Sequence, residues 1–268
     1  MDKAIQALPW LYEKLSDAGV TRQAWFKHIY DVLYFAYKRH LEDPFEHLAR
    51  RHPELFRNGA ILDVGANVGY TTSVFARVLT PGHRLYAFEP ESDNFASLCR
   101  RIDRLQSAPR CEAIPAAVGE RSEKTWLWIN ERSRGDHRIA TRPLRSRVSE
   151  QSLREVPMLS LDDFLGERGD PPVSFIKVDA QGSELQVCRG MSRALTHQPR
   201  LTLAIEYAPA VLQDLGTDPS DLLAFLSGHG LTRYLLSRTG EFKQVGLSEI
   251  QAQVDKRGYV DLVFRRGS

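Results

Sequence analysis

The sequence predicts an α/β fold with a mostly parallel seven-stranded sheet, an antiparallel edge strand and an N-terminal helical extension. Three observations predict it. From residue 60 onward, short apolar runs alternate with helix-patterned segments, as in parallel sheets that helices cover on both faces. A glycine-containing turn joins the first run to a helix, and acidic residues follow three of the runs. The 268 residues suffice for one such domain with an accessory segment.

Residues 1–57 are predicted to form an N-terminal helical cap. Pro44 and Pro53 mark breaks between short helices. A cap packed on the core sheet, a lid over an acceptor pocket and a homodimer surface all fit the apolar pattern of this segment, and helical periodicity alone does not separate them. The pattern is an apolar stripe at three- and four-residue spacing, made by Trp25, Phe26, Ile29, Val32, Leu33, Ala36 and Tyr37.

Residues 58–268 are predicted to form the ligand-binding domain. A long polar connection between the last two strands suits an antiparallel edge pair, and residues 125–130, with two tryptophans, favour an additional short strand. The expected strands are 60–64, 84–88, 112–118, 173–178, 201–206, 231–237 and 259–265, and the expected helices are 69–79, 91–105, 183–195 and 219–228.

Composition excludes several classes of protein. The formal net charge of +2 gives no reason to expect a nucleic-acid partner. Three cysteines without a C-x-x-C pair support neither a disulfide framework nor a zinc knuckle, and free thiols fit a reducing compartment. No stretch approaches 18 apolar residues, and the N-terminal residues M-D-K-A-I-Q-A-L-P-W lack a signal-peptide core. We therefore expect a cytoplasmic protein without integral membrane association.

The strand–turn–helix–strand unit at residues 60–92 is the most informative stretch. Such a unit holds a nucleotide-like ligand across strand ends, and Glu89, at the tip of the second strand, can accept from ribose hydroxyls. A dinucleotide site needs G-x-G-x-x-G, but here Asn67 takes the place of the middle glycine, and Asp63 would repel a pyrophosphate. A ligand with an ammonium and a sulfonium fits better, which describes S-adenosylmethionine. A nicotinamide cofactor and a purely structural loop are the alternatives.

Acidic residues end three of the predicted strands. Asp179 follows strand 173–178, Glu206 ends strand 201–206, and Glu89 ends strand 84–88. Ligands of open α/β sheets bind at the carboxyl ends of the strands. Each acid alone fits a helix cap or a surface charge, but together, at matched positions, they predict a site.

An arginine-rich insertion at residues 131–156 interrupts the alternation, and its nearest acids are Glu131 and Asp136. Long insertions in compact domains are usually functional or disordered. The segment fits a solvated, mobile loop, or a substrate-facing loop in which Arg134 and Arg138 grip an anionic acceptor through bidentate hydrogen bonds. Nucleic-acid binding is disfavoured, because no basic stripe continues elsewhere.

Five motifs occur in order: L-D-V-G-A-N-V-G-Y-T-T, A-F-E-P, V-P-M-L-S-L-D-D-F-L, F-I-K-V-D-A-Q-G-S-E and L-A-I-E. In content and order they resemble the FkbM-type S-adenosylmethionine-dependent methyltransferases over roughly residues 60–235. The resemblance implies a class I methyltransferase-like, Rossmann-like fold and S-adenosylmethionine as cofactor. It also implies that the turn holds the methionine part of this donor through Asp63, Gly65, Asn67 and Gly69.

The resemblance further implies that Glu89 takes the ribose hydroxyls and that Asp179 lies beside the methyl-transfer centre. Many members read D-V-E-G-x-E where residues 179–184 read D-A-Q-G-S-E, so Gln181 stands in place of the usual acid. The family mostly methylates oxygen, often on sugars or secondary metabolites.

The resulting hypothesis is O-methylation of a hydroxyl on a small-molecule, sugar or secondary-metabolite acceptor, with an anionic acceptor favoured by the arginines. A base helps such a reaction by removing the hydroxyl proton, and the candidates are Asp179 and His137. Glu206 is a further candidate for acceptor binding. The alternatives are an NAD(P)-dependent oxidoreductase and a non-catalytic S-adenosylmethionine-binding protein. No metal site is predicted: Asp162 and Asp163 fit a helix N-terminus better than a metal pair.

Overall fold

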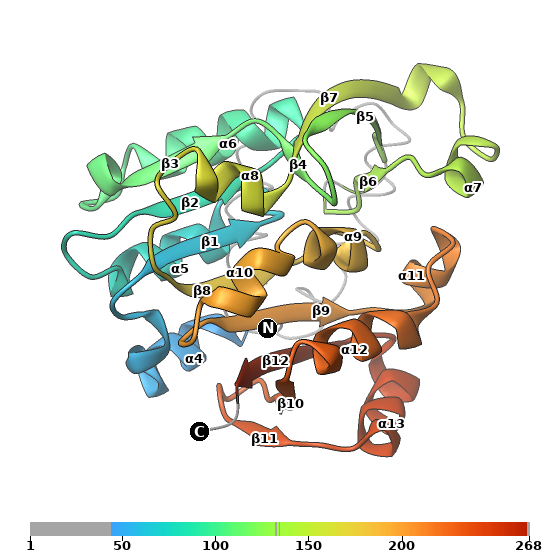
Figure 1. Ribbon diagram of the computed structural model, residues 1–268. Coiled ribbons are helices and arrows are strands. Elements are labelled where there is room, and N and C mark those ends of the chain that lie inside the picture. Colours follow the sequence, from blue (N-terminus) through green and yellow to red (C-terminus); the bar gives the residue numbers. More distant parts are fainter. Residues whose placement is uncertain (1–43, 132, 134, 267–268) are drawn as a thin grey trace, which may run out of the picture.

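The computed structural model describes residues 44–131, 133 and 135–266 (Figure 1). The apolar stripe at residues 25–37 lies outside the described residues, and so does Arg134. Helix α4 (Phe45–Arg51) begins after Pro44, and the short 3-10 helix η3 (Pro53–Phe56) begins at Pro53, so the predicted break between short helices at Pro53 is confirmed. Among the described residues, none of the helices combines the length and hydropathy needed to span a bilayer.

The main sheet is mostly parallel, as predicted. Its strands are β1 (Ala60–Val64), β2 (Leu85–Phe88), β3 (Cys111–Ile114), β8 (Val173–Val178), β9 (Thr202–Tyr207), β10 (Leu231–Leu236), β11 (Phe242–Gln244) and β12 (Val260–Arg266). They lie in the order β11-β10-β12-β9-β8-β1-β2-β3. The five strands from β3 to β9 pair in parallel, whereas β12 runs antiparallel to both β9 and β10.

The main sheet therefore has eight strands, one more than the seven that the sequence predicted. The edge strand β11, antiparallel to β10, was missed because it has only three residues and lies inside the polar connection between β10 and β12. The same connection also contains helix α13 (Leu247–Arg257). The predicted antiparallel pair of the last two strands is confirmed, with β12 inserted between β9 and β10.

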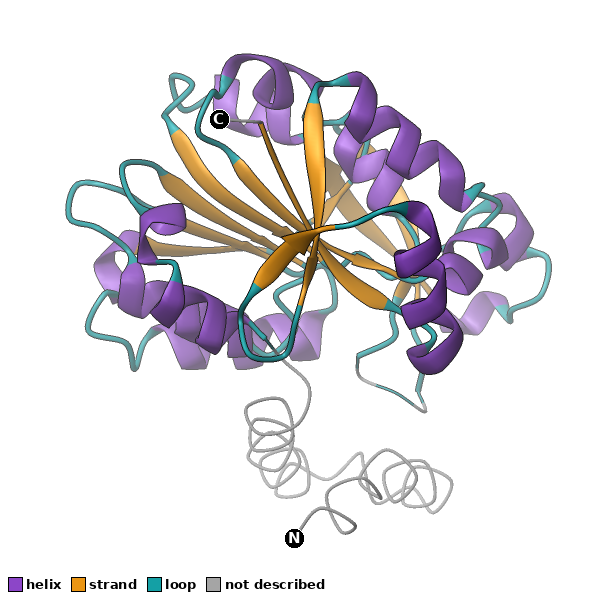
Figure 2. Ribbon diagram, turned by 90° about the horizontal axis from the view of Figure 1, so that it is seen from below, coloured by secondary structure: helices purple, strands orange, loops and turns teal. Residues whose placement is uncertain are grey.

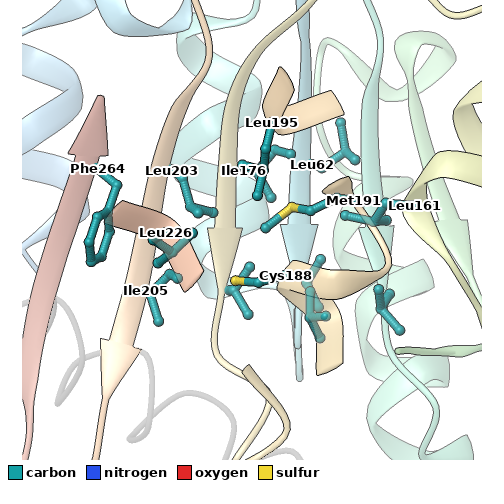
Figure 3. Close-up of a cluster of buried hydrophobic side chains, with 14 of the residues drawn as sticks. Leu62, Leu161, Ile176, Cys188, Met191, Leu195, Leu203, Ile205, Leu226 and Phe264 are labelled. Carbon is teal, nitrogen blue, oxygen red and sulfur yellow. The ribbon is translucent and has the colours of Figure 1, made fainter. Parts of the chain in front are cut away.

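Helices cover both faces of the main sheet (Figure 2). Along the strands, alternate residues enter opposite clusters of buried apolar side chains: Leu62 and Ile176 face one cluster, and Ile61 and Phe175 the other. The first cluster packs against α8 (Leu161–Gly166), α9 (Glu184–Arg189), α10 (Ser192–His197) and α12 (Pro219–Gly228) (Figure 3). The second packs against α4, α5 (Tyr70–Val78) and α6 (Ser92–Ile102).

Two predicted elements are divided in the structure. The expected strand 112–118 is β3 and β4 (Ala117–Val118), which belong to different sheets. The expected helix 183–195 breaks between α9 and α10 at Gly190, where a Cβ would lie 2.0 Å from the Gly119 carbonyl oxygen. This close approach holds the break in place.

A second sheet, which the sequence did not predict as a unit, stands at the carboxyl ends of the main strands (Figure 1). Its order is β4-β7-β5-β6, with β5 (Glu123–Trp128), β6 (Arg138–Ile139) and β7 (Leu153–Leu159). Strand β5 confirms the short strand expected around the two tryptophans. The described part of the arginine-rich insertion is largely regular structure, because it supplies β6, α7 (Arg142–Arg145), η5 (Glu150–Ser152) and the start of β7.

Candidate functional site

A cavity lies between the carboxyl ends of the main strands and the second sheet. The empty space within it, open solvent at its mouth included, is about 610 Å³. The main sheet contributes polar groups, and the second sheet contributes an apolar wall. The polar residues are Asn67, Glu89, Asn94, His137, Asp179, Gln181 and Ser183, and the wall includes Val118, Leu127 and Ile139.

In the turn after β1, the backbone N–H groups of residues 65–69 all donate to acceptors within the protein. The N–H groups of Gly65 and Ala66 donate to the Phe88 carbonyl, and that of Gly69 to the Ala66 carbonyl. The two N–H groups between them donate to the Glu89 Oε2 (2.9 Å) and to Asn67 Oδ1 (2.7 Å). A pyrophosphate at such a turn needs these same donors. Since all five are occupied, the turn is unsuited to a dinucleotide.

Gly65 brings the ends of β1 and β8 together. Its φ is +73°, and a Cβ there would lie 1.9 Å from the backbone oxygen of Asp179. The backbone N–H of Asp179 also donates to the Val64 carbonyl (3.1 Å). Gly65 thus sets how closely the two strand ends approach at the cavity floor.

Asp63 is buried beneath this turn and does not line the cavity. Its side chain is fully buried, and the hydroxyls of Thr71 and Thr72 donate to its Oδ2 at 2.8 and 2.6 Å. The ammonium of Lys177 lies 3.7 Å from its Oδ1. This placement argues against direct contact with the donor, which the sequence suggested, and gives Asp63 the role of fixing the start of α5. Gly69, the N-cap residue of α5, likewise does not line the cavity.

Glu89 is a buried carboxylate at the tip of β2. Its two oxygens each accept one backbone N–H, from Asn67 and from Glu91, both at 2.9 Å. A carboxylate has about four acceptor positions, so it can still accept from a ligand. Burial raises the pKa of this carboxyl to about 7, against the lowering effect of the two N–H donors. Glu89 therefore titrates near neutrality.

Asp179 lies at the end of β8 and lines the cavity. Gln181 Nε2 donates to its Oδ1 (2.7 Å), and Lys177 Nζ donates to its Oδ2 (3.4 Å). Both donors stabilise the ionised carboxylate. Gln181 also reaches Glu206 Oε1 at 3.5 Å, so the amide bridges two strand-tip acids. Glu206 itself does not line the cavity.

The buried carboxylate of Glu184 supports the segment between β8 and α9. It accepts from the backbone N–H groups of Ala180 (3.0 Å) and Gly182 (3.1 Å). Burial raises its pKa to about 7. Gln181, within this segment, has a φ of +48°, a left-handed conformation that these hydrogen bonds help to maintain.

The insertion brings His137 to the cavity but turns Arg138 elsewhere. His137 Nδ1 accepts from the backbone N–H of Asn130 at 3.1 Å. Arg138, with 16% of its side chain exposed, donates to Asp136 (2.6 Å) and to Asp214 (3.1 Å). Arg138 does not line the cavity, so its predicted grip on an anionic acceptor has no support in this geometry. Arg134 lies outside the described residues.

The structure thus brings five of the predicted residues to one cavity: Gly65, Asn67, Glu89, His137 and Asp179. The sequence missed the apolar wall. The only local sign of this wall in the sequence is that Thr125, Leu127 and Ile129 alternate with other residues and so share one face of a strand. This alternation does not show which part of the protein that face covers.

Asp162 and Asp163 both accept hydrogen bonds within the fold. Asp162 accepts from the backbone N–H groups of Arg193 and Ala194 in α10, at 2.8 and 2.9 Å. Asp163 accepts from the hydroxyl of Ser122 (2.6 Å). Among the described residues, no group of three His, Cys, Asp or Glu side chains is arranged to hold a metal ion.

The cavity fits an adenosyl donor. Such a ligand presents an apolar base, a ribose diol and a cationic methionine part. The lining offers apolar side chains from both sheets, including Phe88 and Val118, with carboxylates at Glu89 and Asp179. Charged and polar acceptors of this kind suit a diol and a cation.

Comparisons with known proteins agree with this fit. The FkbM methyltransferase domain matches residues 63–232. The chain is 26% identical over 178 residues to hexuronic acid methyltransferase AglP of Haloferax volcanii, covering 65% of this chain and 64% of that protein. It is also 26% identical over 205 residues to 31-O-demethyl-FK506 methyltransferase FkbM of Streptomyces tacrolimicus, covering 68% of this chain and 76% of that protein.

A crystal structure of methyltransferase FkbM from Methylobacillus flagellatus KT shares the fold, with a TM-score of 0.50 and 20% identity over 98% of this chain. The alignments span less than two thirds of AglP, at 64%, and of the Methylobacillus protein, at 58%. The family match, by contrast, covers more than half of this chain. The chain therefore belongs to the FkbM methyltransferase domain family, and its domain is that of an S-adenosylmethionine-dependent methyltransferase.

Proposed function

We propose that this chain methylates a hydroxyl oxygen of a small-molecule, sugar or secondary-metabolite acceptor. The observation that carries the proposal is that two strand-tip carboxylates, Glu89 and Asp179, line one cavity beneath an apolar wall. The relatives support the acceptor class: by name, one acts on a hexuronic acid and the other on 31-O-demethyl-FK506.

Glu89 and the turn at residues 65–69 hold the donor. S-adenosylmethionine, when bound, supplies a methyl group on a positively charged sulfur. Glu89 accepts from the ribose hydroxyls with the acceptor positions that the two backbone N–H groups leave open. Asn67, whose side chain lines the cavity, contacts the donor from the turn.

Asp179 acts at the acceptor end. It accepts the hydrogen bond of the reacting hydroxyl, orients the oxygen and takes its proton. Lys177 and Gln181 keep the carboxylate ionised and fixed in direction. Orientation of this kind contributes up to about 7–11 kcal/mol to such displacements, and a positioned base contributes about 10²–10⁴-fold in rate.

The test is methyl transfer by the purified full chain, with methyl-labelled S-adenosylmethionine and a panel of acceptors. The panel contains a glycan ending in a hexuronic acid, its neutral hexose counterpart and a macrolide with a free secondary hydroxyl. We expect acceptor-dependent formation of S-adenosylhomocysteine and a gain of one methyl group on an acceptor oxygen. Comparison of the methylation rates of the first two acceptors shows whether a carboxylate on the acceptor increases methyl transfer.

Two outcomes favour the alternatives. Tight binding of the donor without transfer to any panel member supports a non-catalytic S-adenosylmethionine-binding protein. Tight binding of NAD(P) in calorimetry, with no binding of the donor, supports an oxidoreductase. The occupied N–H groups of the turn argue against the second outcome.

The ribose assignment predicts a pH dependence of donor binding. Ribose hydroxyls donate to the ionised Glu89 carboxylate, whose pKa is about 7 before binding. The dissociation constant of S-adenosylhomocysteine should therefore rise roughly tenfold for each pH unit below 7. Glu89→Gln should weaken binding at pH 8 by about 1.5–3 kcal/mol and remove the dependence. Isothermal titration calorimetry from pH 5.5 to 8.5 measures both.

The unfolding free energy serves as the control, because the contribution of Glu89 to it should change in the opposite direction. Folded Glu89 retains a proton that the unfolded chain loses between about pH 4.5 and 7. This group therefore lowers stability as pH rises through that range. Weak binding at low pH, found together with an undiminished free energy of unfolding, then does not reflect unfolding. A wild-type dissociation constant that is independent of pH contradicts the ribose assignment.

A further inference from the structure

His137 is held in one particular hydrogen-bonding state. Its Nδ1 accepts from the backbone N–H of Asn130 at 3.1 Å, and a backbone N–H can only donate. Nδ1 therefore carries no proton. In a neutral imidazole the proton must then be on Nε2, which makes Nε2 a donor.

We infer that His137 binds the methyl acceptor as a hydrogen-bond donor through Nε2–H, and that it is not the general base. This inference rests on the proposed function, whose acceptor occupies the same cavity. As a base, His137 would need a lone pair on Nε2, which requires the proton on Nδ1. That tautomer points an N–H at the Asn130 N–H, so the hydrogen bond that fixes the ring would be lost.

Hydrogen bonds and ion pairs link the described residues on either side of His137. Asp136 accepts from Asn130 Nδ2 (2.9 Å) and from Arg138 Nε (2.6 Å). Arg138 continues to Asp214 at the end of α11 (Pro209–Asp214), at 3.1 Å. Arg147 donates to the same carboxylate at 2.7 Å and to the Asp214 carbonyl.

Arg138 is thus a positioning residue for His137. Its guanidinium ties β6 of the second sheet to α11, and α11 begins two residues after β9 ends. A bidentate guanidinium is suited to bridging two carboxylates, whereas a lysine presents one charge. By pairing with Asp136 and Asp214, Arg138 keeps Asn130 and His137 at their hydrogen-bonding distance beside the cavity.

The inference narrows the class of acceptor. Asp179 accepts a hydrogen bond, and His137 donates one, within the same cavity. An acceptor matched to both presents a reacting hydroxyl and a second oxygen with lone pairs, as in a vicinal diol or a hydroxy acid. Both arrangements occur in sugars, and neither requires an arginine.

The first experiment needs no acceptor. In ¹⁵N-labelled full chain saturated with S-adenosylhomocysteine at pH 8, we expect a through-hydrogen-bond coupling between the Asn130 amide nitrogen and His137 Nδ1. Arg138→Gln should weaken or abolish the coupling, whereas Arg142→Gln, at an exposed arginine of the same insertion, should retain it. A proton found on Nδ1 of the wild type overturns the inference.

The second experiment uses two amide substitutions of His137 to decide whether its side chain acts as a hydrogen-bond donor or as a general base. The Gln side-chain nitrogen in His137→Gln reaches the place of Nε2, so the variant keeps the donor but cannot take a proton. In His137→Asn the amide oxygen reaches the place of Nδ1, so this variant keeps the Asn130 bond and loses the donor. With the acceptor identified in the panel, His137→Gln should retain kcat within about tenfold, and His137→Asn should lose about 10²-fold or more.

Equal losses of kcat in the two variants, each of 10²-fold or more, identify a base and overturn the inference. If no panel member is methylated, the proposed function fails, but the coupling between Asn130 and His137 still decides the state of the ring. The two failures are therefore distinguishable.

Discussion

Asp179→Asn should lower kcat for methyl transfer by about 10²–10⁴-fold while changing the dissociation constant of S-adenosylhomocysteine by less than about tenfold. The amide cannot take the hydroxyl proton. It also offers only one acceptor oxygen where Asp179 now accepts from both Gln181 and Lys177. Release of S-adenosylhomocysteine measures the rate, and calorimetry measures the affinity.

Glu206→Gln is the matched control, since Glu206 is a strand-tip acid on the neighbouring strand that contacts Gln181 but does not line the cavity. We expect its kcat to fall by less than about tenfold. If the two variants lose the same rate, the loss reflects the shared contact with Gln181 and not proton removal by Asp179. If Asp179→Asn retains normal turnover with its authentic acceptor, Asp179 is not the base.

The predicted site residues that the structure brings to the cavity are mostly those set by local pattern. β1, the turn and β2 lie within about 30 residues, and the turn spacing limits the ligand before any tertiary contact is known. The acids at 89 and 179 were located because a strand period of two and the direction of a parallel sheet decide which end each occupies.

The parts that could not be predicted depend on distant partners. The sequence showed Glu131 and Asp136 as the nearest acids to Arg138, but it did not show that Asp214, 76 residues further along, accepts one of its N–H groups. β6 has two residues, too few for a visible period, and becomes a strand through pairing with β5.

Asp63 shows a different limit. The sequence placed an acid beside the ligand turn, but residue identity does not fix the direction of a side chain. In the structure Thr71, Thr72 and Lys177 surround the carboxylate and turn it from a ligand contact into a support for the turn. A buried acid needs such partners. Hydroxyls eight and nine residues downstream could have indicated them.

Gly65→Ala should lower the free energy of unfolding by about 4 kcal/mol, which for a chain of this size lowers Tm by about 8–16 °C. Two costs combine. The left-handed φ of +73° disfavours any side chain, and the new Cβ would lie 1.9 Å from the backbone oxygen of Asp179. Because this neighbour is backbone, no rotamer change relieves the overlap, and the ends of β1 and β8 must separate. Calorimetry or thermal melts measure the loss.

Two control glycines separate these costs from the effect on the site. Gly82→Ala has a φ of +82° with nothing within 4 Å, so it reports strain alone, about 1 kcal/mol or 2–4 °C. Gly59→Ala places a Cβ 2.5 Å from the Ser174 backbone nitrogen, at the other end of the same strand pair, so it reports overlap far from the cavity. Gly59→Ala should destabilise the fold yet leave the dissociation constant of S-adenosylhomocysteine within about twofold, whereas Gly65→Ala should raise it by about tenfold or more, because it displaces the turn at residues 65–69 that holds the donor. If Gly65→Ala behaves like Gly82→Ala in both measurements, the close contact of the two strand ends does not shape the site.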